Sequence, residues 1–177
     1  MTSFVGNLSF GHIAECQISR FLIKKNWGVI PAYEKLLKDQ KGPRIFPSFQ
    51  KEPYISPDLL IYKGQEVYWA ECKNKTGVPY NRHRSIFTTG IDKVHFENYL
   101  KVDKETPWKV YVFFLHGDEV LEGTPEGCVP PSGLFTQWIG NLKLTINHEC
   151  EKNAMIYWDC SVLIKLCNLK EFMEKIC

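Results

Sequence analysis

The sequence contains no apolar run that approaches the roughly eighteen residues needed to predict a membrane-spanning helix. Its first residues also lack the basic start and apolar stretch that are typical of a secretory signal. These two absences predict a protein that neither spans a membrane nor is secreted. We therefore expect an intracellular, cytoplasmic location.

Closely spaced cysteine pairs are missing as well. The chain has 7 cysteines, an odd number, and no CxxC pair, so a disulfide framework is not expected. Four of them follow one another near the end of the sequence, with His148 close by: Cys150, Cys160, Cys167 and Cys177. That set allows a zinc or iron–sulfur site, but metal-binding cysteines usually come in close pairs, and Cys160 and Cys167 lie in apolar surroundings typical of small buried side chains.

The sequence has little net charge, and its formal value of +2 does not by itself indicate nucleic-acid binding. The distribution is uneven, however. Residues 20–51 hold eight Lys or Arg against two acids, whereas residues 116–142 hold four acids and no Lys or Arg. This asymmetry would turn a polyanion toward one side of the protein, although charged residues on solvated faces would produce the same pattern.

Repeats, low-complexity tracts and long linkers are absent too, so nothing divides the chain. Its 177 residues, 44% hydrophobic and 24% charged, have the composition of an ordinary globular protein with a sizeable core. We expect one domain over residues 1–177.

What the sequence does contain is two short charged motifs joined by a predicted hairpin. Pro57-Asp58 precedes an apolar run over residues 59–62, residues 63–65 supply turn chemistry, and a second run returns over residues 66–73 and ends in Glu71-Cys72-Lys73. Side chains alternate along a strand, so Glu71 and Lys73 share one face while Cys72 points to the other. If the register sets Asp58 opposite Glu71, two carboxylates and an amine converge.

Such a trio suits metal-dependent phosphodiester chemistry. Carboxylate oxygens are the ligands that Mg²⁺ and Mn²⁺ prefer, and the backbone carbonyl of Cys72 would lie near the same ion. Lys73 would orient a water molecule or take up its proton. Acids and lysines on the solvated face of a hairpin are common, but here they follow the apolar run of residues 67–70, where an unused charge would be costly.

With Pro57-Asp58 and Glu71-Cys72-Lys73, the sequence resembles the PD-(D/E)xK nuclease superfamily, the restriction-endonuclease-like and Holliday-junction-resolvase-like enzymes. The resemblance covers about residues 10–115 and implies an α/β fold, a mixed β-sheet flanked by α-helices with an αβββαβ core. It also implies a further acid on the first helix, where Glu15 lies. The other interpretation of Glu15 is an acid that the helix dipole favours in a first turn.

The remaining apolar patterns predict the elements around the motif. We expect a first helix over residues 11–25, a strand over 27–33, a short polar helix followed by a Pro-marked loop over 34–56, and a strand over 108–115 that is apolar enough to be central. Residues 89–92 are expected to open a helix that packs on the sheet through residues that include Val94, and His95 on it is expected at the surface or core edge. Further expectations are a short helix over 134–144, a strand over 155–158, and a closing helix over 168–176 capped by Asn168.

Two segments carry candidate substrate contacts. Arg44 lies in the Pro-marked loop, and its guanidinium fork suits a phosphate. The loop that follows Lys73 carries Tyr80, which could stack on a base, and the basic residues Arg82 and Arg84. His116, at the end of the central strand, binds either a phosphate or nothing.

We therefore expect a Mg²⁺-dependent endodeoxyribonuclease, with Mn²⁺ able to substitute, that hydrolyses phosphodiester bonds in DNA. Its metal ligands would be Asp58, Glu71 and the carbonyl of Cys72, with Lys73 at the reacting water and Glu15 as an accessory acid. Three alternatives stay open: a nucleic-acid-binding module of the same fold that cuts only with a partner or not at all, a Cys/His zinc protein, and a nuclease acting on RNA. A homodimer or a protein partner is possible, since the chain has no obvious target-recognition domain.

Overall fold

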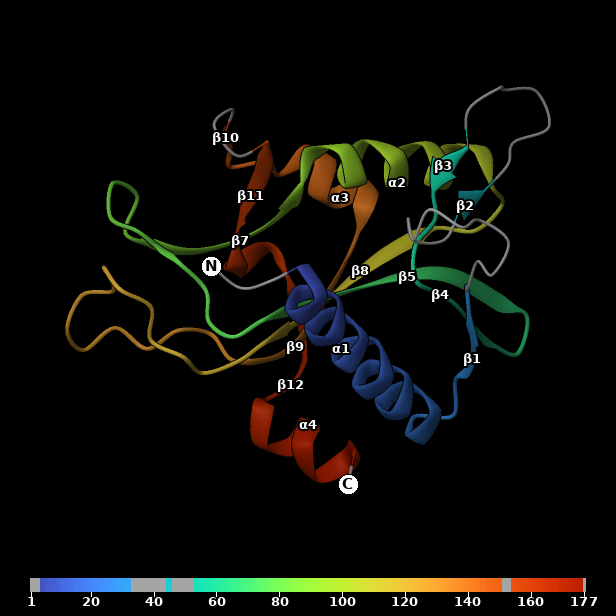
Figure 1. The fold of residues 1–177 in the computed structure, drawn as a ribbon, viewed down its shortest axis with the longest axis horizontal. Helices are drawn as coiled ribbons and strands as arrows, with labels where there is room; N and C mark the ends of the chain where they lie inside the picture. The colour runs from blue at the N-terminus through green and yellow to red at the C-terminus, as the bar shows by residue number, and fades with distance from the viewer. Residues whose placement is uncertain (1–3, 33–43, 46–52, 151–153, 177) are drawn as a thin grey trace.

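The computed structural model describes residues 4–32, 44–45, 53–150 and 154–176, with side chains from residue 12 onward in the first helix. A six-stranded sheet with the order β1-β4-β5-β8-β9-β12 forms its centre (Figure 1). The strands are β1 Gly28–Pro31, β4 Leu59–Lys63, β5 Glu66–Lys75, β8 Val110–His116, β9 Gly133–Trp138 and β12 Ile164–Cys167. The helices are α1 Phe4–Lys24, α2 Lys93–Glu105, α3 Ile139–Leu144 and α4 Leu169–Ile176, with a 3₁₀ turn at Cys160–Val162.

The order α1, β1, β4, β5, α2, β8 along the chain is the αβββαβ core that the motif implied. All neighbours in the sheet are antiparallel except β5 and β8, which run parallel and are connected through α2. That exception makes the sheet mixed, as expected.

The predicted hairpin is present as β4 and β5. Lys63 pairs with Glu66, and the turn between them contains Gly64 at φ +62°, a left-handed conformation that glycine adopts without a Cβ clash. From this turn the register runs through Ile61 opposite Tyr68 to Leu59 opposite Ala70. The turn therefore sets which residues of the two strands face each other at the far end.

The sheet has a core on each face, as expected for strands that are apolar on both sides. On one face α1, with Ile18, and α4 pack against alternate residues of β4, β5 and β8, including Ala70, Cys72 and Phe113. On the other face α2 and α3 pack against Val110, Val112 and Phe114 of β8, with Phe96, Tyr99 and Trp158. Figure 1 shows the same layers, with α2 and α3 on one side of the sheet and α1 and α4 on the other.

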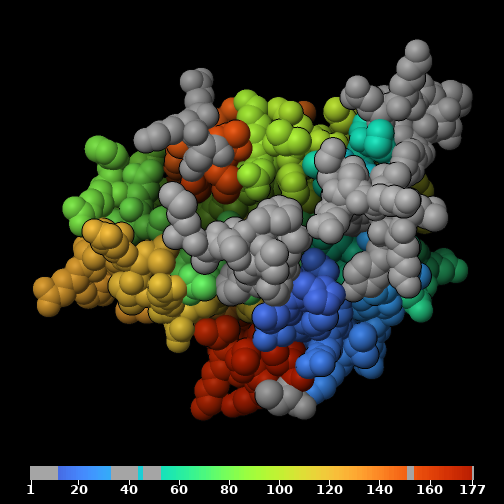
Figure 2. Space-filling view, in the orientation of Figure 1, coloured from blue at the N-terminus to red at the C-terminus, as the bar shows by residue number. Residues whose placement is uncertain are grey.

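A second sheet has the order β10-β11-β7-β6, and two short strands, β2 and β3, form a separate ladder. Their bounds are β2 Arg44–Ile45, β3 Tyr54–Ile55, β6 Tyr80–Asn81, β7 Ile86–Asp92, β10 His148–Cys150 and β11 Met155–Asp159. The β6–β7 hairpin and the loop of residues 117–132 project side by side from one end of the molecule (Figures 1 and 2).

Two expectations about the elements were wrong. Residues 89–92 end strand β7 instead of opening a helix, because Thr88 to Asp92 pair with β11 residue by residue and α2 begins only at Lys93. Gly90 belongs in that ladder, since a Cβ there would lie 2.6 Å from the carbonyl oxygen of Ile156. As a result Val94, expected to pack on the sheet, is 57% exposed.

The second error concerns residues 134–144. Gly133–Trp138 is strand β9 beside β8, and only Ile139–Leu144 is helical. Gly133 fits because its φ is +125° and a Cβ would lie 2.2 Å from the carbonyl oxygen of Cys167 on β12. The strand over 155–158 and the closing helix are confirmed, whereas most of the expected polar helix after residue 33 lies outside the described residues.

Candidate active site

Asp58 and Glu71 come together at the open end of the β4–β5 hairpin. Continuing the register beyond Leu59 and Ala70 sets Asp58 opposite Glu71, and both side chains lie on the sheet face that α2 covers. The backbone N–H of Cys72 donates a hydrogen bond to Oδ2 of Asp58 at 2.8 Å. Asp58 therefore lies opposite Glu71, which was the condition for the two carboxylates and the amine to converge.

Lys73 lies beside both carboxylates. Its Nζ is 2.5 Å from Oε1 of Glu71, and Glu71 is only 2% exposed. Burial works to lower the pKa of Lys73, but Glu71 and Asp58 outweigh it and raise the pKa well above its usual range. The lysine is thus held as a cation against the carboxylate pair.

The two carboxylates are costly to keep charged in this place. Burial, and after it the charge of Glu71, raises the pKa of Asp58 well above its usual value, and Lys73 offsets only part of that effect. Oε2 of Glu71 is buried and has no hydrogen-bond partner among the described residues. A divalent cation between the two would supply the missing partner, so these residues fit the expected metal.

A larger ligand cage is not formed. The described part of the chain contains no group of three or more His, Cys, Asp or Glu side chains placed to hold a metal ion. Two carboxylates and a backbone carbonyl remain a sufficient protein contribution for Mg²⁺, which keeps several of its waters.

Glu15 faces this pair from helix α1. Burial raises its pKa, His12 opposes the rise through a contact of 3.5 Å, and Glu71 adds to the rise. The side chain is 25% exposed. The structure thus brings Glu15 within electrostatic range of Glu71.

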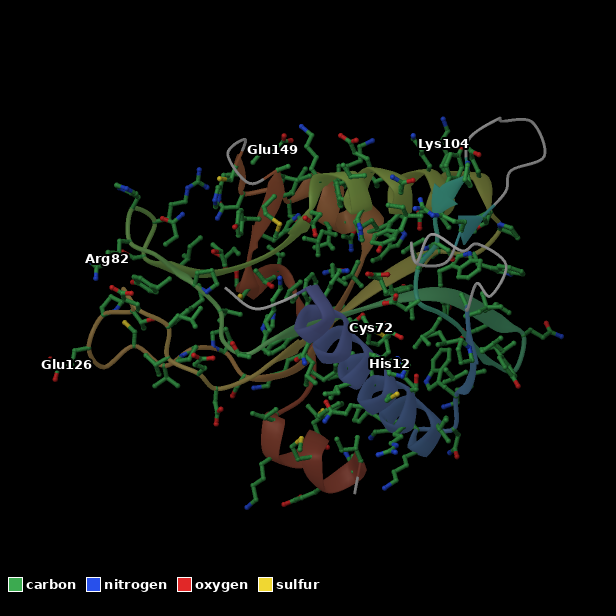
Figure 3. The ribbon with its side chains drawn as sticks, viewed as in Figure 1. His12, Cys72, Arg82, Lys104, Glu126 and Glu149 are labelled. Carbon is green, nitrogen blue, oxygen red and sulfur yellow. The ribbon has the colours of Figure 1, made fainter. Side chains whose placement is uncertain are left out.

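The Cys72 side chain points away from the carboxylates, as the strand alternation predicted. It is 5% exposed and packs in the core beneath α1 with Ile18 and Leu59 (Figure 3). Burial and the nearby carboxylates raise the pKa of its thiol well above the usual value, so the sulfur stays protonated.

Helix α2 contributes residues that the sequence did not assign to the site. Tyr99 is 1% exposed, and burial followed by the charges of Glu71 and Asp58 raises its pKa. Its hydroxyl lies 3.1 Å from Nδ1 of His95, whose pKa burial and Lys73 lower. The i,i+4 spacing of His95 and Tyr99 places them on one helix face, a signal that would have found them once α2 was placed over β5.

The four candidate substrate contacts lie in two different places, Arg44 in one and Tyr80, Arg82 and Arg84 in the other. Arg44 lies on the α2 side of the sheet, because it pairs with Ile55 of β3 and the backbone N–H of Ile55 donates to Oδ1 of Asn98 on α2. Tyr80 packs edge-on against Phe87, and Nε of Arg82 donates to the carbonyl of Gly123 at 2.9 Å. Arg84 donates to the side-chain oxygen of Asn147.

These contacts place the loop at some distance from the carboxylates. Figure 3 shows Arg82 at the outer end of the projecting hairpin, away from Cys72, and Glu126 on the neighbouring acidic loop. Both arginines of this loop are engaged in hydrogen bonds within the chain.

His116 is a core residue. It is 0% exposed, its ring lies 4.9 Å from that of Phe135, and its Nε2 is 3.2 Å from Oγ1 of Thr89. Such burial leaves a substrate no access to it. Cys160 and Cys167 are likewise buried, in keeping with their apolar surroundings.

The protein has the restriction-endonuclease-like α/β fold that its motif predicted. Its structure is similar to that of Hjc, a Holliday junction resolvase from the archaeal hyperthermophile Archaeoglobus fulgidus, with a TM-score of 0.52 and 11% identity over 88% of this chain and 96% of the resolvase. A nuclease from a fusselovirus also aligns, at 16% identity over 99% of this chain and 93% of that one, with a TM-score of 0.40. No family model and no curated protein matches the sequence.

Among the described residues, no helix is long and apolar enough to cross a membrane.

Proposed function

We propose that this protein is a metal-dependent nuclease that hydrolyses phosphodiester bonds in DNA. The observation that carries the proposal is the convergence of Asp58, Glu71 and Lys73 at one end of the β4–β5 hairpin, on a fold shared with a Holliday junction resolvase. Asp58 alone or Glu71 and Lys73 alone would be ordinary for a strand end at the surface, whereas a buried Glu71 beside a half-buried Asp58, with a lysine against them, is a costly arrangement.

Each residue of the candidate site would have its own role in the reaction. Asp58, Glu71 and the carbonyl of Cys72 would hold Mg²⁺, or Mn²⁺ in its place. When bound, the ion would neutralise charge on the scissile phosphate and lower the pKa of a water molecule. Lys73, held as a cation, would orient the attacking water, and Glu15 would act as an accessory acid from the α1 side.

Substrate contacts would begin with Arg44. It pairs with Ile55, which is hydrogen-bonded to Asn98 of α2, and from the α2 side of the sheet its guanidinium fork would meet a phosphate. Tyr80, Arg82 and Arg84 would contact only DNA that runs past the site toward the projecting hairpin.

The second candidate is a DNA-binding module of the same fold that cuts only with a partner. The expected homodimer or protein partner would then complete the site or supply target recognition.

The test uses the purified full chain with supercoiled plasmid, circular single-stranded DNA, branched DNA and an RNA of matched sequence. With Mg²⁺ or Mn²⁺ we expect cutting of at least one DNA, no cutting in a chelator, and none with Asp58→Ala or Lys73→Ala. Lys104→Ala is the matched control, because Lys104 is exposed on α2 and far from Cys72 (Figure 3).

Cutting that survives in both site variants would mean a contaminating enzyme or a misplaced site. DNA binding without cutting under either metal would favour the binding module. Preferential cutting of the RNA would overturn the choice of DNA.

A further inference from the structure

Lys75 continues the candidate active site along β5. Side-chain alternation sets it on the same sheet face as Glu71 and Lys73. Its backbone is held on both sides, because Lys75 pairs with His116 of β8 and its carbonyl accepts the N–H of Gly117 at 2.7 Å. The strand therefore presents this lysine from a fixed position.

The ammonium group of Lys75 lacks the partner that its neighbour has. Lys73 pairs with Glu71, whereas Lys75 is half-buried and makes neither a salt bridge nor a side-chain hydrogen bond within the described part of the chain. The charges that act on it are Lys73, which repels it, and the exposed Asp92, which attracts it. Burial first and Lys73 second lower the pKa of Lys75, so holding this cation costs stability that Asp92 offsets only in part.

The place of Lys75 suggests the anion that would compensate it. Residues two apart on a strand lie about 7 Å from each other, and consecutive phosphates of one strand follow every 3.4 Å or so along the duplex axis and farther apart along the backbone. A strand whose scissile phosphate meets Lys73 therefore brings a neighbouring phosphate within reach of Lys75. The side chain of Lys75 is only half-buried and keeps access to solvent.

We propose that Lys75 forms a second phosphate-binding position for the phosphodiester next to the scissile one, beside the metal site on β5. This rests on the proposed nuclease function. The position would fix the register of the strand across Asp58 and Glu71, which makes Lys75 a substrate-positioning residue. The competing role is structural, with Lys75 supporting the fold through Asp92.

The test compares Lys75→Met, Lys75→Arg and the surface control Lys104→Met in the full chain. Binding of a fluorescent DNA duplex is measured by anisotropy in a chelator over a range of salt concentrations, so that no metal or cleavage enters. We expect Lys75→Met to bind several-fold more weakly and to lower the slope of log affinity against log salt by about 0.9, the effect of one lost phosphate contact. Lys75→Arg and Lys104→Met should keep most of the wild-type slope.

Thermal unfolding separates positioning from support of the fold. Removing a half-buried charge that Asp92 offsets only in part should leave the midpoint of Lys75→Met equal to or above that of the wild type. A lower midpoint together with an unchanged salt slope would overturn the proposal in favour of the structural role. An unchanged affinity and slope, or a wild type that binds no DNA, would overturn it as well.

Failure of the phosphate-binding role of Lys75 can be distinguished from failure of the nuclease proposal. If Lys75→Met weakens binding while Asp58→Ala and Lys73→Ala still cut, the phosphate position stands and the catalytic assignment fails. If those two variants are inactive while Lys75→Met binds and cuts like the wild type, the reverse holds.

Discussion

His116 is a titratable side chain that the fold holds neutral in the core of the sheet. Burial, with Lys75 adding to it, lowers its pKa to about 4 from 6.5. In the unfolded chain the same imidazole takes up a proton near pH 6.5, so the unfolded state binds more protons between the two values. The stability that comes from the neutral ring is therefore present above pH 6.5 and is lost as the pH falls toward 4.

We expect this one group to contribute about 3 kcal/mol to the loss of stability over that pH interval. The measurement is the free energy of unfolding in urea at several pH values for the wild type and for His116→Gln. The variant should be less stable at neutral pH, because it loses the Thr89 contact, but its stability should change less with acid. His83→Gln is the control, since His83 is exposed and should keep the wild-type slope. Equal slopes for wild type and His116→Gln would contradict the assignment.

Residue alternation explains why Asp58, Glu71 and Lys73 could be predicted. Two strands and a short turn fix their register locally, so the sequence alone sets a carboxylate opposite a carboxylate. Tyr99 and His95 lie near these residues only because α2 packs on the face of the sheet that carries them. The positions of Tyr99 and His95 depend on contacts between segments distant in the sequence, which no local pattern contains.

At the scale of elements, helix α4 has a capped start that can be tested in isolation. The side chain of Asn168 accepts the backbone N–H of Glu171 at 2.8 Å, which satisfies one of the free donors of the first turn. The helix docks through Phe172, whose ring centroid lies 5.4 Å from that of Phe21 on α1. The cap therefore supports the packing of α4 beneath the sheet.

Asn168→Ala should lower the free energy of unfolding by about 1 kcal/mol, the usual cost of losing an N-cap. Urea denaturation would show this as a lower midpoint with an unchanged slope. Asn168→Ser and Asn168→Asp, which keep an acceptor, should stay close to the wild type. If all three variants lose the same stability, Asn168 acts through packing and not as a cap.

The sequence predicted a helix or strand correctly where one local feature, such as an apolar run or a helix cap, was strong. The apolar run of β8 and the capped helix α4 carry such signals, and both are present. Residues 86–92 and 133–138 form strands because they pair with β11 and with β8, partners far away in the sequence. Their composition alone, with threonine and glycine in both, is compatible with a helix start or a loop.

On the scale of the whole molecule, the candidate site lies where the two helical layers meet the sheet. Glu15 comes from the α1 layer, Tyr99 from the α2 layer, and the carboxylate pair from the sheet between them. Concentrating negative charge at this place costs stability to the entire fold. Binding of a metal ion to these carboxylates should raise the free energy of unfolding. Thermal unfolding can therefore report whether the site binds metal.

The raised pKa of Asp58 determines how this group changes the stability of the fold with pH. A carboxyl group whose folded-state pKa lies above the unfolded value of 3.8 contributes stability at low pH and loses it as the pH rises through the folded value. At neutral pH the charged Asp58 is thus a net cost in the absence of metal. Asp58→Asn removes the charge but keeps an oxygen that can accept the N–H of Cys72.

We therefore expect Asp58→Asn to unfold at a higher temperature than the wild type in a chelator at neutral pH. Added Mg²⁺ should raise the midpoint of the wild type, by the equivalent of about 2.7 kcal/mol at a hundred times the dissociation constant, and should leave that of Asp58→Asn nearly unchanged. Glu97→Gln, which neutralises an exposed acid on α2, is the control and should respond to Mg²⁺ like the wild type. Sodium chloride at equal ionic strength separates specific binding from screening. If Mg²⁺ stabilises the wild type and Asp58→Asn equally, the ion binds elsewhere and Asp58 is not one of its ligands.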